Sequence, residues 1–489
     1  MSDTSNKQRQ QQINESLKAF NEDPLGFMNR QPVKKNSAGE VINAKSLFSE
    51  KNIENKDYIS VRDALRLSIV QKQQVNSTRA AFESNDMAES LVDKFRHSDL
   101  ESIEAADLMA AKLDESPWSD DYWALYTGAL GKRYADPDFP EADDWMANAQ
   151  YIQENMPAPV MEGRSAAMIN RLSPAEKYDA LIGDDNYTLT RRMWNEGKYY
   201  HDAKGSVEPW MGICHGWAPA AYMMPRPTNS IIVKSGNGNF ITFYPDDIKA
   251  LASLLWAKVA PETRFIGGRC DDKEPEQDEI GRNTSVNCFD TNPGTWHLAV
   301  VNQIGVSRRS MVLDATYDYE VWNQPIFSYD YQYFNPETGE AVDTLEEAKV
   351  AMGDLTNDRF SDYRSLNTSS LVGIQMELSY VVETSPSQNE EDDPSRDSID
   401  TVGYLYDLEL DASGKVIGGE WYMNPHPDFL WTPPKGARAE TRYDYLATGK
   451  WKKGKKVPKQ WREAAKQASS SDSAPLAAIV ERLIDLSRA

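Results

Sequence analysis

Strand-forming segments fill the chain after about residue 225, following a first part with helical spacing, and this order restricts the fold more than any other feature. Five segments combine β-branched and aromatic residues at strand length: NSIIVKS, GNFITFY, WHLAVVNQI, SMVLDATY and VGIQMELSYVVE. Among them, residues 246–260, DDIKALASLLWAKVA, have the apolar spacing of an amphipathic helix, with Asp246 or Asp247 placed to cap it. The pattern predicts an α+β fold.

The chain is long enough for two or three packed units, because 489 residues exceed what one hydrophobic core usually holds. Apolar residues with helical spacing from about 58 to 115, and again over 120–134, predict a mostly helical N-terminal unit at 1–160, of which about the first 20 residues are expected to be disordered. A strand-rich core is expected at 161–384. A C-terminal unit at 385–489 is expected to comprise an acidic solvent loop at 385–398, a hairpin turning at Ser413–Gly414 and an amphipathic helix packed on the core.

The charge of the chain limits its partners. A net charge of −23 repels polyanions, which argues against nucleic acid or an anionic membrane surface as the partner. No run approaches 18 apolar residues, so no membrane span is expected. Residues 450–466 carry eight Lys or Arg against one Glu, and we expect this basic segment to pack against an acidic face of the same protein.

Three cysteines, Cys214, Cys270 and Cys288, fit one disulfide and one free thiol. A Cys270–Cys288 bridge would close a 19-residue segment and would indicate an oxidising compartment; two unpaired thiols are the alternative. The N-terminus lacks the apolar core of a signal peptide. We therefore expect either a secreted or periplasmic protein whose signal peptide is absent from this chain, or a cytoplasmic one.

The segment WMGICHGWAPAAYMM at 210–224 points to a nucleophile. Proline is tolerated in the first turn of a helix, so Pro219 predicts a helix that starts within 215–218. Cys214 then lies at or just before the helix N-terminus, where free N–H groups and the helix dipole favour a thiolate and can hold an oxyanion. A buried structural cysteine is the alternative.

A base for this thiol is expected from His297, because the neighbouring His215 would point about 100° away from Cys214 on a helix. If Gly305 and Val306 form a two-residue turn between two strands, His297 faces Asp314 directly across the hairpin. A carboxylate in that position orients an imidazole and stabilises its charged form. A one-residue shift in register would place Asp314 on the opposite face.

Five blocks of the chain resemble the oomycete transglutaminase-elicitor family over about residues 170–435. They read WMGICHGWAPAAYMMPRP, DDIKAL, TWHLAVVNQIG, VLDATYDYEVWNQP and GGEWYMNPHPDFLW. In that family VWNQP, here residues 321–325, opens a short surface peptide that plant cells recognise. After Pro325 this chain reads IFSYDYQYF, which departs from the family's continuation, so the resemblance does not carry plant recognition to this chain.

The resemblance implies a papain-like transglutaminase core at 161–384, with Cys214 as nucleophile, His297 as base and Asp314 as the acid that orients it. The implied activity is that of a protein-glutamine γ-glutamyltransferase. Its partners would be proteins that carry reactive glutamine and lysine, which are joined through a cysteine thioester. The sequence requires no cofactor. Calcium binding by the acidic segments at 271–279 and 136–146 is conceivable, although neither has EF-hand spacing.

Water must be kept from such a thioester, and tryptophans near the blocks are candidates to line a shielded channel. These candidates, each with ordinary core packing as the alternative, are Trp210, Trp217, Trp296 and Trp421. The same three catalytic groups would also suit a peptidase or a protein glutamine deamidase, because they do not choose between amine and water as acceptor. An inactive surface protein resembling an elicitor, with VWNQP as its functional segment, is a further alternative.

Overall fold

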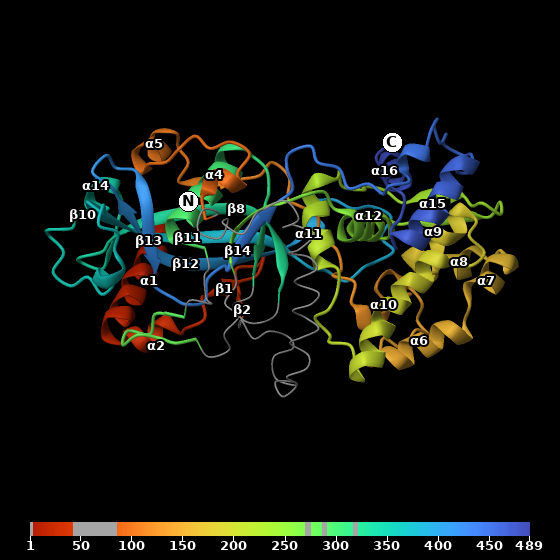
Figure 1. Ribbon diagram of the computed structural model, residues 1–489, viewed down its shortest axis with the longest axis horizontal. Coiled ribbons are helices and arrows are strands. Elements are labelled where there is room, and N and C mark those ends of the chain that lie inside the picture. The colour runs from red at the N-terminus through yellow and green to blue at the C-terminus, as the bar shows by residue number, and fades with distance from the viewer. Residues whose placement is uncertain (1–2, 43–85, 269–274, 286–290, 316–320) are drawn as a thin grey trace.

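The computed structural model describes residues 3–42, 86–268, 275–285, 291–315 and 321–489. The molecule is elongated, with an antiparallel sheet in one half and a helical layer in the other (Figure 1). This mixture is an α+β architecture, as the segment pattern predicted. No helix among these residues combines the length and apolarity needed to cross a bilayer.

Three long strands form the centre of the sheet, in the order β8 (Asn323–Asn335), β11 (Ser370–Val382) and β12 (Ser398–Leu410). The sheet continues beyond β8 through β7 (Val312–Asp314), β14 (Phe429–Thr432) and β6 (Arg264–Gly267). Shorter strands pair at its other edges: β1 (Lys34–Lys35), β2 (Val41–Ile42), β3 (Ala110–Lys112), β9 (Glu340–Val342), β10 (Lys349–Ala351) and β13 (Val416–Trp421).

The helical half surrounds α12 (Pro245–Val259), whose inner face is fully buried. Its other helices are α6 (Trp145–Glu154), α7 (Pro157–Gly163), α8 (Ala166–Asn170), α9 (Pro174–Ile182), α10 (Thr188–Lys204), α15 (Lys459–Ser471) and α16 (Ala477–Ser487), with a small hairpin of β4 (Ile231–Lys234) and β5 (Phe240–Phe243). Helix α11 (Cys214–Met223) lies between the two halves and packs on α12 (Figure 1).

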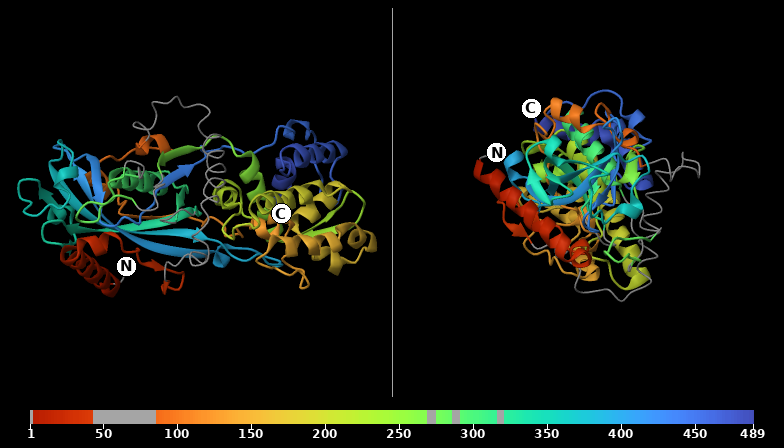
Figure 2. Two further views of the ribbon diagram at one scale, coloured as in Figure 1. Left: turned by 60° about the horizontal axis from the view of Figure 1, so that its bottom comes forward. Right: turned by 90° about the vertical axis from the view of Figure 1, so that its left-hand side faces the viewer.

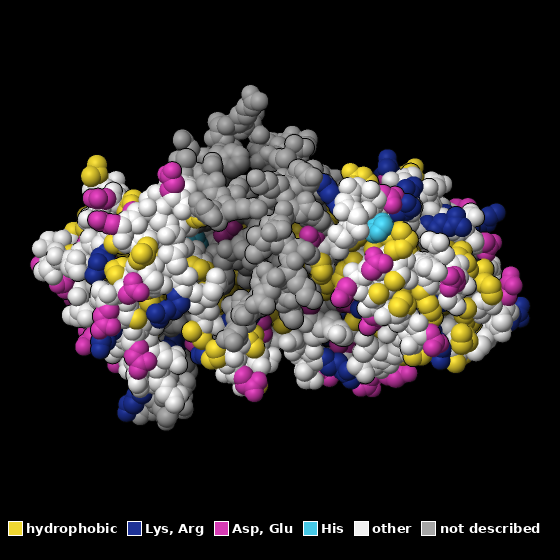
Figure 3. Space-filling view, turned by 90° about the horizontal axis from the view of Figure 1, so that it is seen from below, with side chains coloured by type: hydrophobic (Ala, Val, Ile, Leu, Met, Phe, Trp, Pro, Cys, Tyr) yellow, Lys and Arg dark blue, Asp and Glu magenta, His cyan; other side chains and the backbone are white. Residues whose placement is uncertain are grey.

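Further short helices lie against the sheet half. They are α2 (Pro24–Met28), α4 (Ala88–Leu91), α5 (Leu100–Ala105), α13 (Pro293–Val300) and α14 (Leu345–Ala348), and a π-helical turn at Val301–Val306 continues α13. Acidic and basic side chains are interspersed over both halves on the face seen in Figure 3.

The expectation that the first 20 residues are disordered is wrong, because helix α1 (Asp3–Glu22) lies along the sheet (Figure 2). Its apolar side chains recur on one face, where Ile13, Leu17 and Phe20 are buried in a cluster with Tyr422. Arg9, on the same helix, forms an ion pair with Asp330 of β8. Burial of this face explains why a glutamine-rich segment forms a stable helix.

Most predicted elements are confirmed near their expected bounds. These are the strands at 231–234, 240–243, 312–314 and 370–382, the helix at 245–259, the hairpin with Gly414 at φ +83° in its turn, and the C-terminal helix. Residues 120–134 instead form two short 3-10 turns, Leu125–Thr127 and Ala129–Gly131, joined by Gly128 with positive φ. Of the helical range predicted at 58–115, residues 58–85 lie outside the described residues. The part from 86 to 115 forms only the short helices α4 and α5 and, where helix was expected, strand β3.

The predicted domain boundaries at 160 and 384 remain a prediction. Strands from all three predicted ranges join one sheet, since β1 pairs with β12 and β3 pairs with β8. The basic segment at 450–466 anchors Trp451 and Trp461 in the core, whereas six of its lysines are exposed. Among the described ion pairs, this segment pairs only Lys466 with Glu463 of its own helix, so the expected acidic face is not found there.

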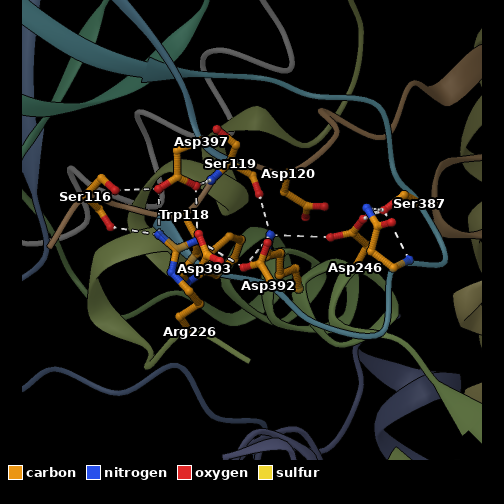
Figure 4. Close-up of polar contacts among 12 residues, drawn as sticks. Ser116, Trp118, Ser119, Asp120, Arg226, Asp246, Ser387, Asp392, Asp393 and Asp397 are labelled. Atoms are coloured by element: carbon orange, nitrogen blue, oxygen red, sulfur yellow. Dashed lines mark hydrogen bonds and ion pairs between the residues drawn. The ribbon is translucent and has the colours of Figure 1, made fainter. Parts of the chain in front are cut away.

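The acidic segment at 385–398 is largely exposed, as predicted for a solvent loop, but two of its aspartates fasten it to the core (Figure 4). Arg226, which follows α11, binds Asp392 at 3.0 Å and Asp397 at 2.7 Å, and all three side chains are at most 5% exposed. Lys249 of α12 also binds Asp392, at 3.1 Å. Each buried charge therefore has an opposite charge beside it, and the network ties the end of α11 to α12 and to the β11–β12 connection.

Candidate active site

Cys214 is the first residue of α11, one residue before the predicted start, and its placement at the helix N-terminus is confirmed. The chain enters the helix through a backbone hydrogen bond from Ile213 N to Tyr122 O, 2.7 Å long. The Cys214 side chain is a free thiol and only 7% exposed. Its backbone N–H, as the first of the helix, has no intrahelical acceptor.

Two glycines allow this close packing. A Cβ atom on Gly212 would lie 2.4 Å from Tyr122 O, and one on Gly216 would lie 2.3 Å from Ser253 O of α12. Backbone atoms occupy both positions, so neither contact could be relieved by a change of rotamer. The glycines on either side of Cys214 therefore fix the depth at which the thiol lies between the two halves.

The sheet presents polar side chains to this thiol. Asp314 of β7 is paired with Asn323 of β8, and Val312 is paired with Trp431 of β14. Because side chains two residues apart share a face, Asp314, Asn323 and Trp431 lie on the same face. We call it the α11 face, because Ala218 of α11 packs in one cluster with Val312 and Trp431.

Hydrogen bonds connect the α11 face to the sulfur. Asn323 Nδ2 donates to Cys214 Sγ at 3.6 Å, and Trp431 Nε1 donates to Asn323 Oδ1 at 2.9 Å. The thiol also lies 3.8 Å from Val321 O. Asp314 is fully buried, and its Oδ1 accepts a hydrogen bond from Trp322 N at 3.0 Å. The segment 321–323 thus holds both the thiol and the carboxylate.

Burial raises the pKa of the Cys214 thiol to about 11. Hydrogen bonds from Asn323 act in the opposite direction, whereas the negative charges of Glu383 and Asp314 raise the pKa further. The expectation of a lowered pKa at the helix N-terminus is therefore wrong, because desolvation of the thiolate outweighs the helix end. At neutral pH this thiol is therefore protonated.

His297 is not in the predicted strand but in α13. Asn292 caps this helix by accepting a hydrogen bond from Gly294 N at 2.8 Å, and Pro293 occupies its first position. His297 Nδ1 is hydrogen-bonded to Tyr406 OH at 2.9 Å, and its Nε2 has no hydrogen-bond partner among the described residues. Burial lowers the pKa of His297 to about 3, so its imidazole is neutral.

The sheet separates His297 from the thiol. Its partner Tyr406 shares a face with Ile326, because both are paired with even-numbered residues of β11. Asn323 lies three residues from Ile326 on the same strand, and this odd separation turns its side chain to the other face. The predicted hairpin pairing of His297 with Asp314 is therefore wrong, although Asp314 does lie on the α11 face and its charge acts on the Cys214 thiol.

The four predicted channel tryptophans do not gather at Cys214. Trp217 and Trp296 are fully buried core residues, and Trp217 Nε1 donates to Trp118 O at 3.0 Å. Trp421 stacks on His426 and lines a cavity of about 320 Å³, and Trp210 is half-buried four residues before the thiol. The aromatic side chains that do lie near the thiol were not predicted; they are Trp322, Tyr122 and Trp431. The rings of Tyr122 and Trp322 contact each other, with 5.4 Å between their centroids, and Trp431 binds Asn323.

The VWNQP segment at 321–325 leads into strand β8, which begins at Asn323, and is not an exposed peptide. Asn323, Gln324 and Pro325 are buried, whereas Val321 and Trp322 are partly exposed. Gln324 Nε2 donates to both carboxylate oxygens of Glu383, at 2.8 and 3.0 Å. In the folded chain the segment therefore builds the thiol site and presents only two of its side chains to solvent.

The remaining predictions concern metals and disulfides. Cys270 and Cys288 lie outside the described residues, as do residues 271–274 of one acidic segment. In the part of the chain that the structure describes, no three His, Cys, Asp or Glu side chains are grouped to hold a metal ion. The Cys270–Cys288 disulfide and calcium binding by the acidic segments stay predictions.

Comparison with known proteins gives one family. The family described as Transglutaminase elicitor matches residues 89–444, which include all of the thiol site. The crystal structure of the GP42 transglutaminase from Phytophthora sojae aligns with 23% identity and a TM-score of 0.47, over 68% of this chain and 86% of that one. None of the curated proteins compared with the chain matches it.

Proposed function

We propose that this chain, which belongs to the transglutaminase elicitor family, is a protein-glutamine γ-glutamyltransferase with Cys214 as its nucleophile. One observation carries the proposal. The family match spans a free, buried cysteine at a helix N-terminus, and a carboxylate and an amide donor lie beside it. This set of groups suits acyl transfer through a thioester.

In the first half-reaction the Cys214 sulfur attacks the γ-carboxamide carbon of a glutamine side chain. The sulfur–carbon bond forms, and the carbonyl oxygen takes the negative charge of a tetrahedral intermediate. When the charge returns to the carbonyl, the carbon–nitrogen bond breaks and ammonia leaves with the proton that the thiol lost. The Cys214 N–H at the helix N-terminus is a donor for the oxyanion.

In the second half-reaction the amine of a lysine side chain attacks the thioester. An isopeptide bond forms, the carbon–sulfur bond breaks, and one amine proton returns to Cys214. The sum is glutamine carboxamide plus lysine amine, giving isopeptide plus ammonia. The low exposure of the thiol and the rings of Trp322 and Tyr122 near it would limit water, which would otherwise hydrolyse the thioester to glutamate.

The proton acceptor in this proposal is Asp314. It is the member of the predicted triad that lies on the α11 face, and its charge acts on the Cys214 thiol. A positioned carboxylate can serve as a general base. His297 was predicted for this role, but its ring lies across the sheet and its Nδ1 bonds Tyr406, so the proposal gives it a packing role.

Incubation with a fluorescent primary amine and a glutamine-rich protein such as casein tests the function. We expect wild type to incorporate the amine and to release one ammonia for each amine taken up, and Cys214→Ala to do neither. Ammonia release without amine uptake would identify a glutamine deamidase, and cleavage of the casein chain a peptidase. Turnover by Cys214→Ala equal to wild type, or none by wild type, would contradict the proposal.

A further inference from the structure

Asn323 is placed to act on the reacting atoms. Its side chain is 5% exposed, lies opposite Asp314 in the strand pairing and directs Nδ2 at Cys214 Sγ from 3.6 Å. The oxygen that becomes negative during acyl transfer is bonded to the carbon that the sulfur attacks. This oxygen therefore lies two bonds from Sγ. That is close enough for the Asn323 NH₂ group, which is 3.6 Å from Sγ, to reach it.

The orientation of the Asn323 amide is fixed by Trp431. The indole Nε1–H of Trp431 can only donate a hydrogen bond, and it donates to Asn323 Oδ1 at 2.9 Å. Turning the amide by 180° would set its NH₂ group against the indole N–H, so two donors would face each other. With Oδ1 held by the indole, the NH₂ group must face the sulfur.

A purely structural role would not need this amide. To satisfy the buried indole of Trp431 only an acceptor is required, and a carboxylate or a carbonyl oxygen would serve. The two amide hydrogens matter only on the side that faces Cys214. Asparagine at this position adds a neutral donor without adding a charge that would further disfavour the thiolate.

We propose that Asn323 is the side-chain donor of the oxyanion hole. It works together with the backbone N–H of Cys214, and Trp431 acts as the positioning residue that aims it. The inference rests on the proposed acyl transfer at Cys214. At rest the amide donates to the sulfur, and in the tetrahedral intermediate a hydrogen of the same NH₂ group reaches the oxyanion. Donors of this kind act at about 2.7–3.1 Å from the charged oxygen.

The test compares four variants in steady-state amine incorporation. Asn323→Asp keeps an acceptor for Trp431 but removes both amide hydrogens, and Asn323→Ala removes the whole group. Both are expected to lower kcat by about 10²- to 10³-fold with KM within threefold of wild type, the usual effect of losing one oxyanion donor. Trp431→Phe leaves the amide free to turn, and we expect kcat to fall by about tenfold. Asn148→Asp, which alters a buried asparagine in α6 of the helical half, is the matched control with unchanged kcat.

A second readout does not depend on turnover. The rate of alkylation of Cys214 by iodoacetamide reports its thiolate fraction. Loss of the amide donor in Asn323→Ala, which adds no charge beside the sulfur, should lower this rate at pH 9 by about fivefold or more relative to wild type and to Asn148→Asp. A residue that only packs the strand would leave the alkylation rate unchanged.

The outcomes separate the two claims. If wild type incorporates no amine, the proposed function fails, and the alkylation rates still decide whether Asn323 acts on the sulfur. Asn323→Asp with kcat within threefold of wild type, or Asn323→Ala with an unchanged alkylation rate, would overturn the inference. Should both Asn323 variants lose their thermal unfolding transition, Trp431→Phe decides, because a kcat equal to that of wild type in this variant would also overturn it.

Discussion

Asp314→Asn is expected to lower kcat for amine incorporation by about 10²- to 10⁴-fold, the range that a positioned general base contributes. The Cys214 thiol has a pKa of about 11, so little thiolate exists at neutral pH and attack depends on a nearby proton acceptor. An asparagine oxygen can still accept the Trp322 N–H bond that Asp314 Oδ1 accepts at 3.0 Å. The local backbone should therefore stay in place while the acceptor for the proton is lost.

The matched variant is His297→Gln, which changes the residue that the sequence predicted as the base. The structure places this ring on the face of the sheet away from the thiol, bonded to Tyr406. We expect a kcat within tenfold of wild type and an effect similar to that of Tyr406→Phe, with both variants mainly lowering thermal stability. A loss by His297→Gln as large as that of Asp314→Asn, with Tyr406→Phe unaffected, would show that His297 reaches the thiol in another arrangement and would refute the assignment of Asp314 as sole base.

Arg226→Met should lower the free energy of unfolding by about 3–5 kcal/mol, the usual cost of removing one partner of a buried ion pair. The substitution leaves Asp397 buried without its bidentate partner (Figure 4). Among the described cations, Asp392 then keeps only Lys249. These charges lie where α11, α12 and the β11–β12 connection meet. Urea unfolding followed by tryptophan fluorescence measures the loss, and we expect kcat to fall with it as α11 loosens.

Arg438→Met is the control for this prediction. Arg438 pairs with Glu481 and Glu440 at the surface, where its side chain is 46% exposed. Exposed ion pairs of this kind contribute about 0–1 kcal/mol, so this variant should unfold close to wild type. If Arg226→Met lost no more stability than Arg438→Met, the buried network would not be holding α11 in place.

Local signals were sufficient to predict Cys214 at a helix N-terminus. Proline at position 219 restricts the helix start within about one turn of chain, and the structure places that start one residue from the predicted range. The strands at 312–314 and 370–382 were predictable for the same reason, because their composition of β-branched and aromatic residues is local. The α+β class followed from these elements.

The segment TWHLAVV could not be assigned from its periodicity. Both sides of this run are buried, and a continuous apolar run fits a buried strand or a buried helix equally well. The signal that favours the helix lies just before it, in Asn292 as the cap and Pro293 as the first helical residue. Assigning a strand here led directly to the wrong partner for His297.

The amide and indole of the site could not be predicted from sequence at all. Asn323 lies 109 residues from Cys214 and 108 residues from Trp431 along the chain. Their meeting depends on the register of β7 with β8 and of β7 with β14, and a slip of one residue would turn each side chain to the other face. The raised thiol pKa was unpredictable for a related reason, since burial arises from tertiary packing.

Direct observation of the acyl-enzyme tests the central claim. Wild-type protein is mixed with a short glutamine peptide without amine, quenched in acid within seconds and digested with a protease. The mass of the proteolytic fragment that contains Cys214 is then measured by mass spectrometry. We expect that fragment to carry an added mass equal to the glutamine peptide less ammonia, and we expect this added mass to disappear when a primary amine is added before the quench. A wild-type protein that releases ammonia from the peptide while Cys214 stays unmodified, or carries the acyl group on another residue, would contradict it.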